Sequence, residues 1–242
     1  MDIAVVTLFP ELVAPLAQFG VVGRAVQRGQ ARLLLEDPRR HAQDAHGTVD
    51  DRPYGGGPGM VIKVEPFGTA IRAARARVPA GSPVLFLTPQ GEAFDQAVAR
   101  RLAALPGLVL VAGRYEGFDE RLIEAEGDGE LSVGDFVLSG GEIAAMLVAD
   151  AVVRLLPGVL GDDQSAEQES FSEGLLDCPH YTRPESIGGR RVPPVLLGGD
   201  HEQVRRWRRK QALGRTRLRR PDLLAGRALS AEDRALLDEF LA

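Results

Sequence analysis

One short segment of this 242-residue chain gathers five kinds of reactive side chain. Residues 175–184 read LLDCPHYTRP and supply an acid, a thiol, an imidazole, a phenol and a guanidinium. Cys178 and His180 stand too close together, with too few ligating neighbours, to predict a structural zinc site. Their spacing leaves a Cys–His nucleophile pair open, but a thiol beside proline is more often structural.

Three glycine-rich segments could bring backbone close to a ligand, because glycine has no Cβ. They read DRPYGGGPGM at 51–60, GRYEGFDER at 113–121 and SVGDFVLSGGE at 132–142. The first is not a P-loop, because no Gly-Lys-Ser/Thr follows. It is not a dinucleotide fingerprint either, because Met60 replaces the third glycine. Taken alone, 51–60 is more typical of a tight surface turn. The segment 113–121 is equally compatible with a plain strand-to-helix turn, and 132–142 is compatible with an ordinary strand that bends at glycine.

The strand pattern gives two of these segments a position suited to binding. Residues 113–121 directly follow the apolar run 108–112, and ligands of open α/β sheets bind beyond the carboxyl ends of strands. In the segment 132–142, a flat heterocycle such as adenine could lie between backbone edges and apolar side chains such as Val133 and Leu138.

Basic residues are concentrated in one region of an acidic protein. The net charge is -5, yet residues 201–227 contain ten arginines and lysines opposed only by Glu202 and Asp222. Because acids are scarce in this segment, we expect its arginines to bind the phosphates of a nucleic acid. Trp207, at the centre, is expected in the core rather than stacked on a base.

Composition indicates a globular protein of the cytoplasm. The single cysteine, Cys178, excludes an internal disulfide and fits a reducing compartment. The first residues do not resemble a signal peptide. The longest apolar stretch, 143–156, is interrupted by Asp150 and Arg154, so no membrane association is expected.

Short apolar runs alternating with amphipathic segments predict an α/β fold with a mostly parallel sheet. The expected strands are 3–9, 31–35, 84–88, 108–112 and 135–138, and the expected helices are 65–78, 94–105, 118–126 and 143–156.

The chain is expected to form two domains, 1–160 and 174–242, joined by a flexible linker over 161–173. The second would be a small helical domain. Asp200 and Ser230 are predicted to cap its helices, with Leu236, Leu237 and Phe240 facing inward.

Taken together in this order, these segments resemble the bacterial tRNA (guanine-N1)-methyltransferase family. The resemblance rests on DDRPYGGGPGM at 50–60, GRYEG at 113–117, VLSGGE at 137–142, LDCPHYTRP at 176–184, RWR at 206–208 and LGRT at 213–216. It implies a fold of the SPOUT superfamily with a deep trefoil knot and a homodimer with its active sites at the subunit interface. It further implies S-adenosylmethionine as methyl donor, Mg²⁺ as a requirement, and the anticodon stem-loop of tRNA as the binding partner. The target would be the guanine immediately 3′ of the anticodon.

The resemblance also assigns residues to the site. The expected cofactor-binding positions are Leu87, Thr88, Pro89, Gly113, Tyr115, Glu116, Val133, Gly134, Asp135, Phe136, Val137, Leu138, Gly140 and Gly141. The position of a metal is not assigned, although Glu116 is a carboxylate suited to lie near one.

The chemistry requires a base, because guanine N1 carries a proton until one removes it. The family's base is an aspartate, and the matching residue here is Glu169, one methylene longer. We expect Glu169 to act as base, with Asp50 and Asp177 as reserve candidates. Arg154 would stabilise the charge that develops on O6.

Two other functions fit parts of the pattern. A SPOUT-like RNA-binding protein without activity would keep the fold, but Arg154, Glu169 and the glycine segments argue against lost catalysis. A nicotinamide-dependent oxidoreductase fits the strand pattern but lacks the glycine fingerprint.

Overall fold

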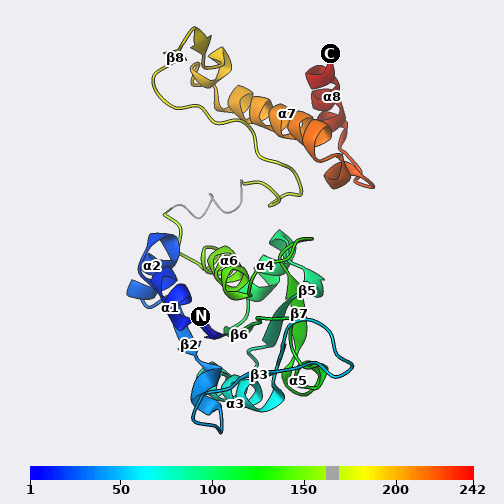
Figure 1. The fold of residues 1–242 in the computed structure, drawn as a ribbon. Helices are drawn as coiled ribbons and strands as arrows, with labels where there is room; N and C mark the ends of the chain where they lie inside the picture. Colours follow the sequence, from blue (N-terminus) through cyan, green and yellow to red (C-terminus); the bar gives the residue numbers. More distant parts are fainter. Residues whose placement is uncertain (162–168) are drawn as a thin grey trace. The chain divides into compact units, whose positions relative to one another are not determined.

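The computed structural model describes residues 1–161 and 169–242, which divide into two compact units. The first unit is Met1–Gly161, and the second contains the remaining residues. Figure 1 shows both units.

The first unit is built on a five-stranded sheet in the order β2-β1-β6-β5-β7, and every neighbouring pair is parallel. Its strands are β1 (Asp2–Val6), β2 (Arg32–Glu36), β5 (Val84–Ala93), β6 (Gly107–Ala112) and β7 (Gly129–Ser132). Its helices are α1 (Pro10–Val13), α2 (Gly20–Gln27), α3 (Val64–Arg75), α4 (Gln96–Ala103), α5 (Glu120–Glu126) and α6 (Glu142–Val153). A two-stranded ribbon, β3 (Asp50–Asp51) with β4 (Val61–Ile62), completes it.

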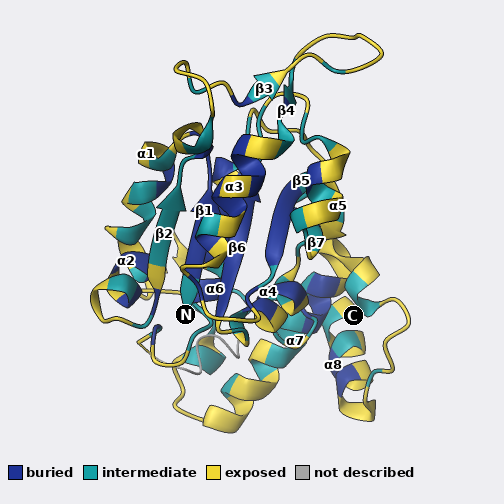
Figure 2. Cartoon of the chain, turned by 90° about the horizontal axis from the view of Figure 1, so that it is seen from below, coloured by how far each residue is buried: buried dark blue, intermediate teal, exposed yellow. Residues whose placement is uncertain are grey.

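The central strands are buried on both faces because successive side chains point to opposite sides of the sheet. Ile3, Val5 and Leu110 pack with α2, α4 and α6. Ala4 and Val109 pack with α3 and α5 on the other face. Figure 2 shows these strands as buried, with helices on both faces. The predicted α/β fold with a mostly parallel sheet is confirmed.

One predicted strand is wrong. Residues 135–138 form no strand, since β7 ends at Ser132. The backbone then turns, with Gly134 at φ +147° and the Phe136 N–H donating to the Gly134 carbonyl at 2.9 Å. The apolar run there does not enter the sheet, because the Phe136 and Val137 side chains are 54% and 86% exposed.

The second unit packs two helices around a small core. They are α7 (His201–Arg219) and α8 (Ala231–Leu241), and a hairpin of β8 (Ser186–Ile187) and β9 (Arg190–Arg191) precedes them. Both predicted caps are confirmed, since Asp200 accepts from the Gln203 N–H and Ser230 from the Asp233 N–H. Leu175, Leu213 and Leu236 form the core.

Trp207 was expected in that core but lies half-buried on α7, with its ring centroid 6.3 Å from that of Tyr181.

The expectation that acids are scarce around the α7 arginines is wrong, because it considered only the sequence nearby. Helix α8 supplies Glu232, Asp233 and Glu239, which pair with Arg205, Arg209 and Arg206. The pair of Arg209 and Asp233 is bidentate, with both contacts at 2.8 Å. Several α7 arginines therefore fasten the two helices together.

Among the described residues, no helix is long and apolar enough to cross a membrane.

Replacing Asp233 by Asn should lower the free energy of unfolding of the second unit by about 2 kcal/mol at pH 7. The hydrogen bonds from Arg209 hold the pKa of Asp233 below its usual value. The stabilisation should therefore be complete above the usual aspartate pKa and be lost as pH falls through the lowered one. Urea denaturation followed by the fluorescence of Trp207, the only tryptophan, measures it.

The matched control is Glu239→Gln, because Glu239 also pairs with α7 but its side chain is 46% exposed. Its loss should stay below about 1 kcal/mol. Equal losses of unfolding free energy in the two variants would contradict this role for the pair of Arg209 and Asp233. So would a loss in Asp233→Asn that persists at a pH below the lowered pKa of Asp233.

Candidate active site

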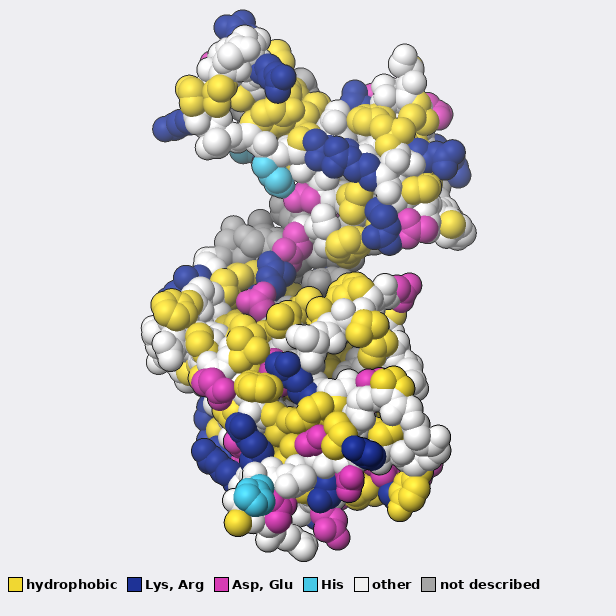
Figure 3. Space-filling model, in the orientation of Figure 1, with side chains coloured by type: hydrophobic (Ala, Val, Ile, Leu, Met, Phe, Trp, Pro, Cys, Tyr) yellow, Lys and Arg dark blue, Asp and Glu magenta, His cyan; other side chains and the backbone are white. Residues whose placement is uncertain are grey.

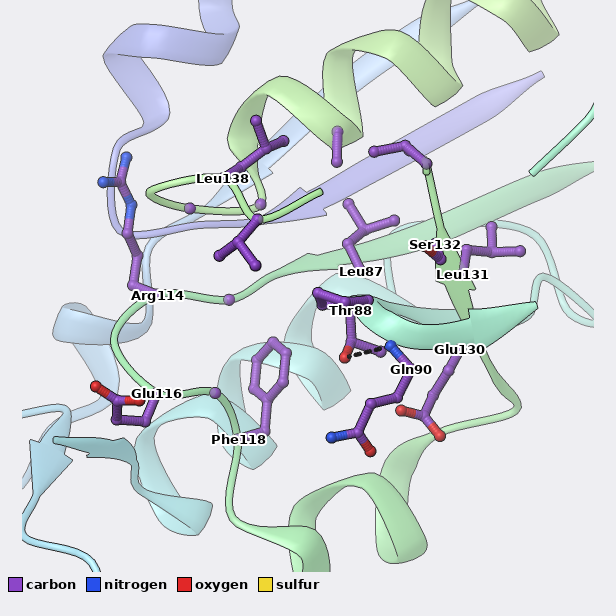
Figure 4. Close-up of a pocket in the computed structure, with 18 of the residues that line it drawn as sticks. Leu87, Thr88, Gln90, Arg114, Glu116, Phe118, Glu130, Leu131, Ser132 and Leu138 are labelled. Carbon is purple, nitrogen blue, oxygen red and sulfur yellow. Dashed lines mark hydrogen bonds between the residues drawn. The ribbon is translucent and has the colours of Figure 1, made fainter. Parts of the chain in front are cut away.

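A cavity of about 370 Å³ opens at the carboxyl ends of β5, β6 and β7. Parallel strands bring these ends to one edge of the sheet, where the loops that follow them meet. Figure 4 shows Leu87, Leu138 and Phe118 around this space, with the Glu116 and Glu130 carboxylates on opposite sides.

Strand β5 forms one wall of the cavity, at the point where its pairing with β7 is interrupted. Leu87 and Glu92 both pair with Leu131 of β7, so the four residues between them bulge out of the ladder. Gly91 permits this bulge, because an ideal Cβ there would lie 2.4 Å from the Leu131 nitrogen. Thr88 and its neighbours consequently face the cavity instead of continuing the sheet.

The loop after β6 is held by the first glycine-rich segment. The Glu116 N–H donates to the Met60 carbonyl, and the Ile62 N–H to the Gly117 carbonyl, each at 2.9 Å. An ideal Cβ on Gly59 would lie 2.1 Å from a Glu116 carboxylate oxygen, so only glycine leaves that side chain its place. The segment 51–60 thus packs against the Glu116 side chain and holds its backbone through the Met60 carbonyl.

The loop after β7 returns to the end of β6 and meets it backbone to backbone. The Gly141 N–H donates to the Gly113 carbonyl at 2.7 Å. An ideal Cβ on Gly141 would lie 2.8 Å from the Ala112 Cα and from the Gly113 nitrogen. This approach closes one side of the cavity and starts α6.

A buried charge network secures the same junction. Glu142, only 1% exposed, accepts from the Thr7 hydroxyl at 3.0 Å and from the Arg114 guanidinium at 3.0 Å. Arg114 also donates to the Ser139 carbonyl at 3.2 Å and lies 4.4 Å from the centre of the Phe9 ring. Gly140 makes room for it, since an ideal Cβ there would be 2.2 Å from Arg114 Nε. Sequence reasoning missed both charged residues, whose only signal was an acid at a helix start.

Tyr115 stands at the mouth of the cavity in a left-handed conformation, with φ at 60°. Burial raises the pKa of its phenol, and the carboxylate of Asp50 raises it further. The phenol therefore stays a neutral hydrogen-bonding group at physiological pH.

Comparison with known proteins gives the family. The sequence model described as "tRNA (Guanine-1)-methyltransferase TrmD" matches residues 1–226. A protein of Methylococcus capsulatus named "tRNA (guanine-N(1)-)-methyltransferase" is 61% identical over 240 residues, covering 99% of this chain and 96% of that one. A protein of the same name from Halorhodospira halophila is 60% identical over 240 residues, covering 99% and 91%. The chain belongs to this family.

Membership in the tRNA (guanine-N1)-methyltransferase family confirms the resemblance read from the sequence, and it favours a methyltransferase over both alternatives. The predicted cofactor positions all line the cavity except Asp135. The cavity also includes residues that the sequence did not single out: Gln90, Arg114, Gly117, Phe118, Glu120, Ile123, Glu130, Leu131, Ser132, Ser139 and Ala144.

The two predicted catalytic residues lie in different units. Arg154 caps the carboxyl end of α6 and does not line the cavity, which lies at the start of that helix. Glu169 belongs to the second unit, where its carbonyl accepts from the Ser172 N–H at 3.2 Å. Of the predicted linker, residues 162–168 lie outside the described part. The catalytic roles expected of Arg154 and Glu169 stay predictions.

The reserve acids also belong to different units. Asp50 lies in β3 beside Tyr115, whereas Asp177 belongs to the second unit. Asp177 accepts from the Cys178 N–H at 2.6 Å and pairs with His180 at 2.8 Å.

Within the described residues, one group of three side chains has the spacing of metal ligands: Asp177, Cys178 and His180. All three belong to the reactive segment singled out in the sequence, where the pair of Cys178 and His180 predicted no zinc site. Their ligand atoms lie within 4.8 Å of one another. A thiol and an imidazole suit zinc better than magnesium. Burial raises the pKa of the Cys178 thiol, and Asp177 raises it further, which opposes the thiolate needed for a metal or a nucleophile. This group does not match the expected magnesium.

Replacing Gly141 by Ala should destabilise the first unit by about 1–3 kcal/mol, because the added methyl meets backbone that cannot move aside. Urea denaturation followed by circular dichroism measures the change. Gly161→Ala is the matched control, because no atom of the described residues lies within 4 Å of an ideal Cβ there. Indistinguishable stability of the two variants would show that the junction tolerates a side chain.

Proposed function

We propose that this chain transfers a methyl group from S-adenosylmethionine to N1 of the guanine immediately 3′ of the anticodon in tRNA. The observation that carries the proposal is the cavity at the ends of β5, β6 and β7, built where glycines bring backbone together. Its size, about 370 Å³, falls in the range of small-molecule sites. Family membership supplies the reaction class.

The cavity offers the groups that the methyl donor needs. Leu87, Leu131 and Leu138 provide apolar surface for an adenine ring. The backbone of the glycine-rich loops provides hydrogen-bonding groups for the ring edge. Glu130 supplies negative charge for the sulfonium and the amino group.

The acceptor side would be supplied by Glu169 and Arg154. The Glu169 carboxylate takes the proton from guanine N1, and the nitrogen lone pair then attacks the methyl carbon as its bond to sulfur breaks. Negative charge that spreads onto O6 is stabilised by the Arg154 guanidinium. The products are 1-methylguanine in tRNA and S-adenosylhomocysteine.

We infer that two chains share each site. Helix α6 has 12 residues, so Arg154 lies about 18 Å from the cavity end of the same helix. That separation favours a homodimer in which the Arg154 of one chain serves the cavity of the other. Three apolar side chains are exposed here: Ile143 and Leu147 on α6, and Phe19 before α2. A second copy of the chain would pack against them.

The trefoil knot of the SPOUT superfamily is part of the proposal. It is supported by the path of residues 133–141, which leave β7 and return to the end of β6 before entering α6. Glu116 would hold Mg²⁺ by its carboxylate, since such sites often use one or two carboxylates plus substrate and water. The reaction would take place in the cytoplasm, where tRNA is modified.

The anticodon stem-loop would bind the basic second unit, whose Lys and Arg side chains are dark blue in Figure 3. Among the described residues, no carboxylate lies within ion-pairing distance of Arg208, Arg215, Arg217 or Arg219 on α7. These arginines are available for phosphates, whereas Arg205, Arg206 and Arg209 hold α8.

Glu169→Gln should lower the single-turnover rate of methylation at least about a hundredfold, because an amide cannot accept the N1 proton. Labelled S-adenosylmethionine and a tRNA transcript in excess enzyme measure the rate. Glu169→Asp, which restores the family's residue, should retain a rate within about tenfold of the starting enzyme.

The affinity for S-adenosylmethionine, measured by calorimetry, should be unchanged in both variants. A near-normal rate for Glu169→Gln would remove Glu169 as the base and direct attention to Asp50 and Asp177.

Replacing both Arg217 and Arg219 by Gln should reduce the salt dependence of tRNA binding. Each lost phosphate contact lowers the slope of log K against log salt by about 0.7–0.9, so the double variant should lose about 1.5. Filter binding between 50 and 300 mM KCl measures the slope. Arg206→Gln, which removes a partner of Glu239, should leave the slope nearly unchanged, and a larger effect from Arg206 would reverse the assignment.

A further inference from the structure

We propose that the second unit contains a separate subsite for one unstacked base of the tRNA, distinct from the target guanine. The subsite is a hollow of about 570 Å³ between residues 180–185 and the hairpin of β8 and β9, here called the hairpin cavity. It shares no residue with the cavity of the first unit. The inference rests on the proposed function, because it takes tRNA to be the substrate.

Tyr181 supplies the stacking surface. Its side chain lines the hairpin cavity and is 49% exposed. Trp207 of α7 lies beside it, with the ring planes inclined at 54° and the centroids 6.3 Å apart. One side of the phenol ring is thus supported by another aromatic ring while much of its surface stays open. Aromatic rings that are held in place and exposed are the usual platform for unpaired RNA bases.

The opposite wall is the hairpin of β8 and β9. Gly188 and Gly189 have φ values of 56° and 77°, as a tight two-residue turn between paired strands requires. The Val192 N–H donates to the Glu185 carbonyl at 2.9 Å and extends the pairing by one more bond.

The polar groups around this hollow match a nucleotide. Glu185 presents a carboxylate that can accept hydrogen bonds from the edge of a base, and Thr182 can donate or accept. Arg190 and Arg191 are exposed, and the only carboxylate near Arg191 among the described residues is Glu185, at 3.9 Å. Such a long and exposed pair is weak, so the arginines can bind the phosphate beside the stacked base.

This combination also explains why Tyr181 and Trp207 are not in the core of the second unit. The core consists of leucines, and the aromatic pair lies outside it, next to cations. A stacking platform beside arginines binds a nucleotide without requiring one particular sequence, which suits a contact that orients the loop while the target guanine is held elsewhere.

The test compares Tyr181→Leu, which keeps an apolar contact for Trp207 but removes the ring, with Tyr181→Phe, which keeps the ring. Tyr181→Leu should bind tRNA about tenfold more weakly, and Tyr181→Phe should bind normally. The affinity for S-adenosylmethionine should be unchanged in both, because the hairpin cavity shares no residue with the cavity of the first unit. Equal tRNA affinity of Tyr181→Leu and the unaltered chain would overturn the proposal.

A second measurement keeps the result from being confused with misfolding. A set of tRNA transcripts, each with one abasic nucleotide in the anticodon loop, is bound to the unaltered chain and to Tyr181→Leu. At one position other than the target guanine, the abasic substitution should remove the difference between the two proteins. A penalty that is the same at every position would show that Tyr181 acts only on the fold.

Failure of the proposed function would be seen differently. If the unaltered chain neither binds tRNA nor methylates it, the methyltransferase assignment fails. If it does both and Tyr181→Leu binds tRNA equally well, only the hairpin cavity loses its role.

Discussion

The candidate site depends on one close approach of backbone to backbone, between Gly141 and the end of β6. The hydrogen bond from the Gly141 N–H to the Gly113 carbonyl, at 2.7 Å, fixes where the last loop returns to the sheet. That position closes one side of the cavity, starts α6 and sets Glu142 against Thr7 and Arg114. A side chain at residue 141 would push the returning loop away from the end of β6, because its Cβ would meet main-chain atoms. All of these parts would be displaced at once.

Helix α6 starts at the cavity and runs for 12 residues away from it. Its far end carries Arg154, a full helix length away from the donor side. A single chain thus holds the cavity proposed for the methyl donor. Of its predicted acceptor residues, Arg154 lies at the far end of α6, and Glu169 belongs to the second unit. The proposed assembly from two copies would bring the Arg154 of one chain to the cavity of the other, and it would cover apolar side chains such as Ile143 that α6 leaves exposed.

The sequence predicted what periodicity and glycine spacing encode, and missed what only tertiary contacts decide. Buried strands and helix caps followed from local pattern, and the cavity-lining glycines followed from family resemblance. Residues 135–138 looked like a strand because they are apolar, yet their apolar side chains face a cavity and the surface. The acids of α8 that neutralise the α7 arginines are separated from them by more than twenty residues, so local charge counting could not find them. The contact of Tyr181 with Trp207 is equally non-local.

Subunit mixing tests most directly whether the donor cavity and Arg154 act together across two chains. Gly141→Ala impairs the cavity and Arg154→Ala the acceptor side, and each variant alone should be nearly inactive. Unfolding them together and refolding the mixture should restore about a quarter of the activity per site, because half the dimers are mixed and each contains one intact site. A mixture no more active than its components would contradict a shared site and, with it, the arrangement proposed for catalysis.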